Sequence, residues 1–361
     1  MSKILSIGTA VPAHCHPQPD IMRFTQLAYA TNEADRRKMR FMYNQSGIDQ
    51  RYSVLPDYSR PASEWTFYPA TEGLDPFPSL EQRMAVYNKQ APALSVDAIR
   101  DCLKHDYPPE SVTHLITVSC TGMSAPGLDL QIVELLDLPR DIFRTSVNFM
   151  GCYAALHALR LGDALCRGQK DARVLIVCTE LCTLHFQRGG TMDNIASALL
   201  FGDGSAAVLL AHDDAPGEGL HLTGFRSEVV PQGKRDMAWE LSSTGFQMTL
   251  SNYIPELIEE DFGAIMDRAL ADQQLQRSDV THWCIHPGGR RILEAIQKSI
   301  GMAKEQLADS YEVLRQYGNL SSATVLFVLK RMLDQRVPIG RMAGAAFGPG
   351  LTVETFTAHT R

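Results

Sequence analysis

The sequence predicts an α/β protein in which a largely parallel, buried sheet is covered by helices and the chain falls into two similar halves. Short apolar runs alternate with segments of helical periodicity, as expected for βαβ crossovers. The same order of strand-like and helix-like segments recurs in the second part of the chain. Its 361 residues, 45% of them hydrophobic, can bury a large core and exceed the size of a single small domain.

The first half of the chain opens on an expected strand and ends at a polar boundary. Residues 53–78 are rich in Pro, Ser and aromatic side chains and predict surface loops. Phe201-Gly202-Asp203-Gly204-Ser205 predicts a tight turn, and the Asp, Pro and Gly residues between His212 and Gly219 suit a boundary between halves. The expected strands cover residues 3–9, 114–119, 143–147, 172–178 and 206–211, and the expected helices cover residues 32–43, 79–105, 128–136 and the segment after Cys152.

The second half repeats this order of elements. Apolar residues at helical spacing predict helices over residues 254–269, 292–300 and 325–333. The expected strands cover residues 282–286, 342–347 and 351–357. We therefore expect two units, an N-terminal one at residues 1–213 and a C-terminal one at residues 214–361.

Composition excludes several classes of protein. The chain has 34 basic and 41 acidic residues, a net charge of −7, and no long run of either sign, which argues against binding to nucleic acid or to an anionic membrane. It has no apolar run of about 18 residues and no leader-like N-terminus. Its eight cysteines are scattered, which favours free thiols in a reducing compartment. We therefore expect a cytoplasmic protein that does not enter membranes.

Cys152 is the first candidate for a functional residue. It follows Gly151 in an apolar run that turns at the glycine and continues as a helix. A cysteine in the first turn of a helix lies near unpaired N–H groups and the positive end of the helix dipole, which favour thiolate over thiol. The alternative is a structural cysteine that packs in the core as a small apolar side chain. This stretch alone leaves both interpretations open.

A histidine and an asparagine lie at two further breaks between the expected strands and helices. His286 precedes Pro287-Gly288-Gly289 at the end of an expected strand, where open α/β sheets place ligands. Asn319 precedes an expected helix, and its alternative role is that of a helix N-cap. Cys, His and Asn together supply a nucleophile and neutral donors for an oxyanion. Papain-type proteases also use this set, but their local cysteine pattern is missing, so we favour an acyl-transfer enzyme.

Other clusters favour structural interpretations. Cys178, Cys182 and His185 have a spacing compatible with zinc, but a structural zinc site needs four ligands and no second cysteine pair is present, so we expect no metal. The Gly-rich turns lack the patterns of phosphate-binding loops. Arg36 and Arg40 share one helix face with Arg37 and Lys38 adjacent, and that face is either solvated or a docking site for a phosphorylated ligand.

Four motifs in this order resemble those of the type III polyketide synthases, the chalcone synthase-like enzymes of the thiolase superfamily. The similarity extends from about Lys3 to Thr357. The motifs are Gly-Cys at 151–152, His-Pro-Gly-Gly at 286–289, Tyr-Gly-Asn-Leu-Ser-Ser-Ala at 317–323 and Phe-Gly-Pro-Gly-Leu-Thr-Val-Glu at 347–354. The resemblance implies duplicated βαβαβ halves in five αβαβα layers. It also implies a homodimer that condenses malonyl-CoA onto an acyl-CoA starter without a cofactor, coenzyme A thioesters being substrates.

The resemblance also implies roles for individual residues. Cys152 would hold the starter and the growing chain, while His286 and Asn319 would bind the thioester carbonyl and assist decarboxylation. Phe201 and Phe246 would be the two gatekeeping phenylalanines, and Ser321 would be a serine that lines the cavity. Three further cavity positions would be Cys182, His185 and Met237, and the two coenzyme A contacts would be Lys38 and Arg40.

Departures from the plant members place the chain nearer to the bacterial-type branch. Cys182 and the Asp-Met-x-Trp run at 236–239 look like those of bacterial members, and Cys182, His185 and Met237 stand where plant enzymes carry small or hydroxyl side chains. His185 and Met237 would narrow the cavity, which favours short polyketides or a linear aliphatic starter over a bulky aromatic one. The expected product is a pyrone, resorcinol, phloroglucinol or naphthalene. The alternatives are a ketoacyl synthase of the fatty-acid initiation type and a non-catalytic coenzyme A-binding or zinc-binding protein of the same fold.

Overall fold

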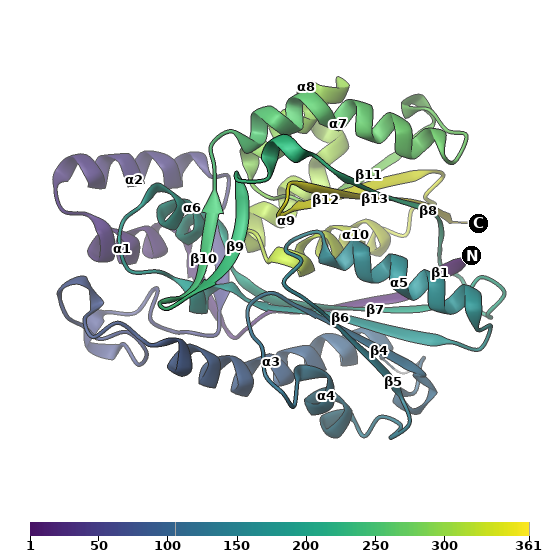
Figure 1. Ribbon diagram of the computed structural model, residues 1–361, viewed down its shortest axis with the longest axis horizontal. Coiled ribbons are helices and arrows are strands. Elements are labelled where there is room, and N and C mark those ends of the chain that lie inside the picture. Colours follow the sequence, from purple (N-terminus) through teal and green to yellow (C-terminus); the bar gives the residue numbers. More distant parts are fainter. Residues whose placement is uncertain (105, 361) are drawn as a thin grey trace.

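The computed structural model describes residues 1–104 and 106–360 (Figure 1). Within them, one large sheet has the strand order β11-β12-β13-β8-β1-β7-β6-β4-β5. Its strands are β1 (Ser2–Ala10), β4 (His114–Ser119), β5 (Phe143–Asn148), β6 (Arg173–Leu181), β7 (Asp203–His212), β8 (Leu220–Val229), β11 (His282–Ile285), β12 (Met342–Gly348) and β13 (Thr352–Thr360). Two small antiparallel pairs are β2 (His14–Pro17) with β3 (Gln50–Ser53) and β9 (Met237–Ser242) with β10 (Gly245–Leu250).

The helices and strands form five layers (Figure 1). In order, these are α3 with α4, the strands β5-β4-β6-β7-β1, α5 with α10, the strands β8-β13-β12-β11, and α7 with α8. Because β1 pairs with β8 over only three positions, from Ser2↔Leu222 to Ile4↔Leu220, the sheet can divide there into two layers. This confirms the expected thiolase-like five-layer fold. The helices are α1 (Gln18–Tyr29), α2 (Glu33–Gln45), α3 (Leu80–Leu103), α4 (Leu128–Leu136), α5 (Ala154–Gly168), α6 (Met192–Leu200), α7 (Ile254–Ala271), α8 (Arg290–Ile300), α9 (Ala308–Tyr317) and α10 (Thr324–Asp334).

The central helices α5 and α10 are buried between the two sheet layers. The predicted apolar face of α10 packs into one core cluster together with the alanine-rich first turns of α5. Small alanine side chains let α5 approach both sheets closely, and each fully buried leucine contributes about 1.5–3 kcal/mol. The layer that carries Cys152 at its start is therefore held rigidly from both sides.

The expectation of a largely parallel sheet is wrong. Parallel pairing occurs in β4–β5, β4–β6 and β11–β12, whereas β1–β7, β1–β8, β6–β7, β8–β13 and β12–β13 are antiparallel. The strands β12 and β13 form a hairpin around Gly350. The strand β7, which follows α6, runs next to β6 in the opposite direction. Periodicity identified these strands but could not distinguish a crossover from such a return.

After the end of β3 at Ser53, the predicted loop region is irregular apart from the 3₁₀ helices Ala62–Glu64 and Glu72–Leu74, but it does not lie wholly on the surface. Residues 53–78 contain buried aromatic side chains, including Tyr58 and Tyr68, that pack with Phe24 of α1. The Asp57 carboxylate accepts hydrogen bonds from three backbone N–H groups of this segment, at 2.8–3.0 Å. Residues 203–205 are not a turn but the start of β7. Glycine is needed there for close packing, because a Cβ on Gly204 would lie 2.8 Å from a methyl carbon of Leu320.

The other expected elements are present with small shifts of their ends. The predicted end of the third helix at His105 lies outside the described residues, within which α3 ends at Leu103. Missing from the sequence-based prediction are α1, α6, α9, β8 and the hairpin β9–β10, several of which build the walls of the cavity described below. None of the helices in the described part of the chain is long and apolar enough to cross a membrane.

Candidate active site

A cavity of about 560 Å³ brings together residues from both halves of the chain. Its walls come from α2, α6, the hairpin β9–β10 and the starts of α7 and α8. Cys152, His286 and Asn319 all line it, as do Phe201, Ser321, Cys182, His185 and Met237. The structure therefore gathers the three predicted catalytic residues into one concave, mostly apolar site, the usual setting for catalysis.

Backbone geometry at Gly151 places the Cys152 side chain in this cavity. The chain leaves β5 at Asn148 and reaches Gly151 at φ +84°, a conformation that favours glycine. A Cβ on Gly151 would lie 2.2 Å from Cδ of Pro349, so a side chain does not fit either. The Gly151 N–H donates to Sγ of Cys120 at 3.1 Å. Cys152 follows directly, two residues before α5 begins.

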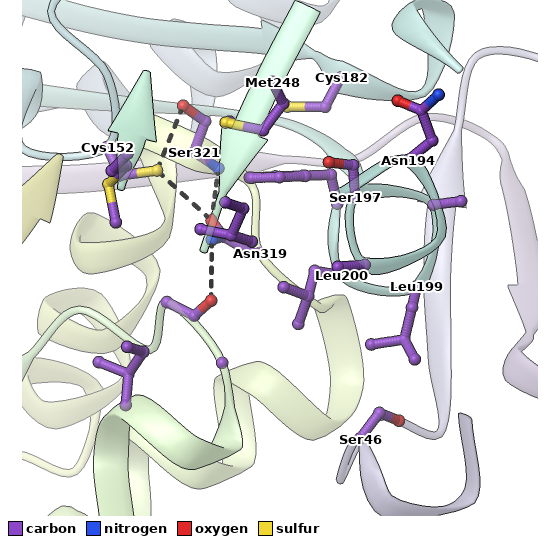
Figure 2. Close-up of a pocket in the computed structure, with 18 of the residues that line it drawn as sticks. Ser46, Cys152, Cys182, Asn194, Ser197, Leu199, Leu200, Met248, Asn319 and Ser321 are labelled. Carbon is purple, nitrogen blue, oxygen red and sulfur yellow. Dashed lines mark hydrogen bonds between the residues drawn. The ribbon is translucent and has the colours of Figure 1, made fainter. Parts of the chain in front are cut away.

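The Cys152 thiol faces two polar side chains from the loop after α9. Its Sγ lies 3.7 Å from Oγ of Ser321 and 4.0 Å from Oδ1 of Asn319 (Figure 2). Burial raises the pKa of this thiol to about 12, an effect that the contacts to Ser321 and Asn319 reduce and the nearby Glu180 carboxylate reinforces. Burial thus acts against the expected thiolate, because loss of hydration disfavours the charged form.

His286 is held as a neutral side chain. It follows β11, and its backbone N–H donates to the Ala345 carbonyl at 2.8 Å. The side chain is 1% exposed, and neither ring nitrogen has a hydrogen-bond partner within the described residues. Burial lowers its pKa to about 3. A neutral imidazole carries one N–H donor, and an unpaired donor beside a cavity is suited to a carbonyl oxygen of a ligand.

Asn319 is fixed by backbone and side-chain hydrogen bonds. Its backbone bridges to the strand-like segment at Phe201, with the Asn319 N–H donating to the Leu200 carbonyl at 2.8 Å. Its Oδ1 accepts from the Ser321 N–H at 2.8 Å, and its Nδ2 donates to the Gly288 carbonyl at 3.3 Å. Because Oδ1 is held by the loop, the amide directs its N–H edge toward Gly288, two residues after His286. The N-cap interpretation is wrong, since Ala323 is the N-cap of α10.

The two predicted gatekeepers lie in different places. Phe201 lines the cavity, whereas Phe246 is buried behind its wall, in contact with Phe149 and His185. Nε2 of His185 lies 2.7 Å from the Thr121 carbonyl, which can only accept, so Nε2 carries the proton. Burial lowers the pKa of His185 to about 3, so this ring is a neutral part of the cavity wall.

Behind the thiol lies a buried carboxylate that the sequence-based prediction missed. Glu180 is buried in β6 and accepts hydrogen bonds from the Cys120 N–H at 2.9 Å, the Thr121 hydroxyl at 2.8 Å and the Ser322 hydroxyl at 2.6 Å. Burial raises its pKa. The available signal was a lone acidic residue inside the apolar run of β6, where an unpaired charge would be costly.

The mouth of the cavity carries cations from two helices. Lys38 of α2 lines it, whereas Arg40 does not: the two positions lie about 200° apart around a helix of 3.6 residues per turn. Arg290 and Arg291 at the start of α8 also line the mouth, and the sequence-based prediction missed both. Their signal was the pair of arginines directly after the His-Pro-Gly-Gly motif.

The zinc-compatible spacing of Cys178, Cys182 and His185 does not form a metal site within the described residues. Among residues 1–104 and 106–360, no group of three or more His, Cys, Asp or Glu side chains is arranged to hold a metal ion. Cys178 is buried within β6, and the N–H of His185 is already directed at Thr121.

Comparison with known proteins identifies similar chains. The N-terminal domain of chalcone and stilbene synthases matches residues 1–214, and their C-terminal domain matches residues 221–360. Among solved structures, PKS-I from the brown alga Ectocarpus siliculosus is 27% identical with a TM-score of 0.93, covering 100% of this chain and 98% of its own. The C-terminal type III polyketide synthase domain of Steely1, a type I/III hybrid from Dictyostelium, is 28% identical with a TM-score of 0.92, covering 99% of each chain.

Proposed function

This chain belongs to the chalcone and stilbene synthase family, the malonyl-CoA-dependent type III polyketide synthases, and we propose that Cys152 carries the starter and the growing chain. The observation that carries the proposal is the convergence of Cys152, His286 and Asn319 on one cavity. These residues come from three separate loops of the fold. They match the nucleophile and donors that acyl transfer requires.

Loading begins from the neutral thiol. Sγ of Cys152 attacks the carbonyl carbon of an acyl-CoA, the new C–S bond forms, and the bond to the sulfur of coenzyme A breaks. We assign transfer of the thiol proton to the departing coenzyme A sulfur to neutral His286, which lines the same cavity. Because burial raises the pKa of Cys152 to about 12 and lowers that of His286 to about 3, it disfavours a preformed thiolate–imidazolium pair.

Extension uses the same two donors. Malonyl-CoA loses carbon dioxide, and the electron pair of the broken C–C bond becomes an enolate on the coenzyme A thioester. We assign stabilisation of the enolate oxygen to N–H groups of His286 and Asn319, whose neutrality avoids burying an uncompensated cation. The enolate carbon then attacks the thioester carbonyl on Cys152, so that a C–C bond forms and the C–S bond breaks. The Cys152 sulfur leaves as a thiolate and regains a proton from solvent before the next transfer.

The cavity walls favour a narrow substrate. The lining of the cavity is largely apolar and includes the side chains of His185 and Met237. We therefore propose a linear aliphatic starter or a short polyketide product in preference to a bulky aromatic starter. Apolar walls bind an alkyl chain through burial of about 0.8 kcal/mol per methylene group.

A starter screen tests this function. The purified protein is incubated with malonyl-CoA and a series of aliphatic and aromatic acyl-CoA starters, and carbon dioxide, coenzyme A and products are measured by mass spectrometry. We expect condensation with aliphatic starters in wild type, and none in Cys152→Ala. The matched control Cys15→Ala, at an exposed cysteine outside the cavity, should retain activity. Condensation by Cys152→Ala would contradict the assignment of the nucleophile.

We also propose a homodimer, formed along the β5 edge of the sheet. Strand β5 is mostly exposed, and the side chains of Phe143 and Leu135 are 58% and 54% exposed on neighbouring elements. Large apolar side chains gathered at a sheet edge are typical of a covered surface. Light scattering coupled to size exclusion should give twice the 40.0 kDa mass of the chain, and Phe143→Glu should shift it toward one chain.

A further inference from the structure

We propose that Arg51 and Gln18 are positioning residues for the reaction, which hold Asn319 in place through the last carbonyls of α6. Both act through the backbone that carries the Asn319 amide and not through contact with the reacting atoms. This inference rests on the proposed function, because it concerns the donor that we assign to the enolate oxygen.

Gln18 and Arg51 together cap the carboxyl end of α6. The last carbonyls of a helix have no partner within the helix and must find one elsewhere. Nε2 of Gln18, the first residue of α1, donates to the Leu199 carbonyl at 2.9 Å. Nη1 of Arg51, in β3, donates to the carbonyl of Phe201, the C-cap of α6. Nε of Arg51 also donates to Oε1 of Gln18 at 2.9 Å, so the two side chains act as one unit.

The carbonyl between these two capped positions holds Asn319. The Leu200 carbonyl accepts from the Asn319 N–H at 2.8 Å, and the Asn319 carbonyl accepts from the Gly202 N–H at 2.9 Å. These two hydrogen bonds form the parallel bridge between Phe201 and Asn319. The side chains of Leu200 and Asn319 both line the cavity (Figure 2). The end of α6 therefore sets the position of the Asn319 backbone.

The aliphatic part of Arg51 supports the other side of this bridge. A Cβ on Gly318 would lie 2.7 Å from Cδ of Arg51 and 2.7 Å from the Leu200 carbonyl oxygen. The backbone directly before Asn319 is thus packed between the Arg51 side chain and the end of α6. Arg51 therefore contacts both partners of the bridge, Phe201 through its guanidinium and the loop of Asn319 through its stem.

Arg51 is an unusual residue to find in this environment. It is 3% exposed, and among the described residues it donates hydrogen bonds to an amide oxygen and a backbone carbonyl and to no carboxylate. Its Nη2 has no hydrogen-bond partner there, and burial lowers its pKa by disfavouring the charged form. A buried cation without a paired anion costs free energy, so Arg51 is poorly explained by stability alone. Its planar set of donors is what lets one side chain bind two oxygens at once.

Two half-reactions separate positioning from general stability. Loading is measured as coenzyme A release from a starter without malonyl-CoA, and decarboxylation as carbon dioxide release from malonyl-CoA without a starter. We expect Arg51→Met to slow decarboxylation, which uses the Asn319 donor, about tenfold. Loading, which we assign to Cys152 and His286, should change less than about twofold. Arg51→Lys, which keeps the charge but not the planar donors, should lie between, and Gln18→Leu should act in the same direction as Arg51→Met.

A double variant tests whether Arg51 acts through Asn319. In Asn319→Ala the donor is gone, so Arg51→Met should slow the residual decarboxylation no further. Arg83→Met is the matched control, because Arg83 is also a buried arginine with an unpartnered nitrogen among the described residues, but it does not line the cavity. It should leave the ratio of the two rates unchanged. Equal slowing of both half-reactions by Arg51→Met, or its full effect in the Asn319→Ala background, would overturn the proposal.

Hydrogen exchange makes the result independent of turnover. Exchange is measured by mass spectrometry on peptides that cover residues 200–203 and 317–321, with a peptide from α10 as the internal reference. Relative to that reference, Arg51→Met should speed exchange of the bridge amides about tenfold, and Arg83→Met should not. Unchanged exchange at the bridge would overturn the proposal. A protein that shows the faster exchange but neither loads nor decarboxylates would instead refute the proposed function and leave the hold of Arg51 on Asn319 standing.

Discussion

Substitution of His286 by glutamine should make the protein less sensitive to acid. Glutamine is neutral at all relevant pH values and keeps a donor near the position of the imidazole, whereas His286 must stay unprotonated in the native state because burial lowers its pKa to about 3. In the unfolded chain the same histidine has its ordinary pKa of about 6.5. The wild type therefore loses stability in acid through protonation of His286 in its unfolded state, and the variant does not.

The size of this loss of stability follows from proton linkage. A group whose pKa is lowered by folding stabilises the native state fully above its unfolded pKa, and that stabilisation is lost as the pH falls from 6.5 toward 3. A pH of 5 lies about 1.5 below the pKa of the unfolded histidine, and each pH unit in this range corresponds to about 1.4 kcal/mol. His286 alone should therefore lower the free energy of unfolding at pH 5 by about 2 kcal/mol relative to neutral pH.

Other groups titrate in the same range, so the comparison must be between proteins. Burial also lowers the pKa of His16 and His185, to about 4 and about 3, and these add to the loss in acid. Burial raises the pKa of Asp203 to about 6, which acts in the opposite direction. All three are present in both proteins and cancel in the difference.

Urea unfolding at pH 7 and pH 5, at one protein concentration, measures the effect. The free energy of unfolding of wild type should fall by about 2 kcal/mol more than that of His286→Gln between these two pH values. Equal losses in the two proteins would show that His286 is protonated in the native state. The neutral donor assigned to it would then be wrong.

Two further predictions concern the support of the thiol. Gly151→Ala should destabilise the protein by about 3 kcal/mol and reduce activity, because residue 151 lies at φ +84° and the new Cβ would lie 2.2 Å from Pro349. An unchanged melting temperature would contradict this prediction. Ser322→Ala should cost about 1–3 kcal/mol because it removes the hydroxyl that donates to buried Glu180 at 2.6 Å, whereas the exposed Ser63→Ala should stay within about 0.5 kcal/mol.

Much of the fold could be predicted because most central elements carry strong periodic patterns. The apolar faces of α5 and α10 and the run of β4 are set by burial on both sides, so their composition identifies them directly. The hairpin β9–β10 could not be identified in this way, because its residues are only partly buried and line a cavity instead of a core. The direction of β7 depends on the return path through α6, which no local pattern encodes.

The candidate site shows the same division. Cys152, His286 and Asn319 lie next to local breaks in the pattern, at Gly151, Pro287 and Gly318, and these breaks together with the family resemblance predict them. The protonation state of Cys152 could not be predicted in this way, because it depends on Glu180 and on the burial of the thiol in the folded protein. The position of Arg291 at the mouth likewise follows from the packing of α8 against the end of α2.

The acyl-enzyme itself tests the central claim most directly. Wild type is incubated with one acyl-CoA starter in the absence of malonyl-CoA, quenched in acid, digested and mapped by mass spectrometry. We predict the acyl mass on the peptide that contains Cys152, and on none of the peptides that contain the other seven cysteines. An acyl group on another residue, or no acyl-enzyme with a starter that supports turnover, would contradict the assignment of Cys152 as the residue that carries the chain.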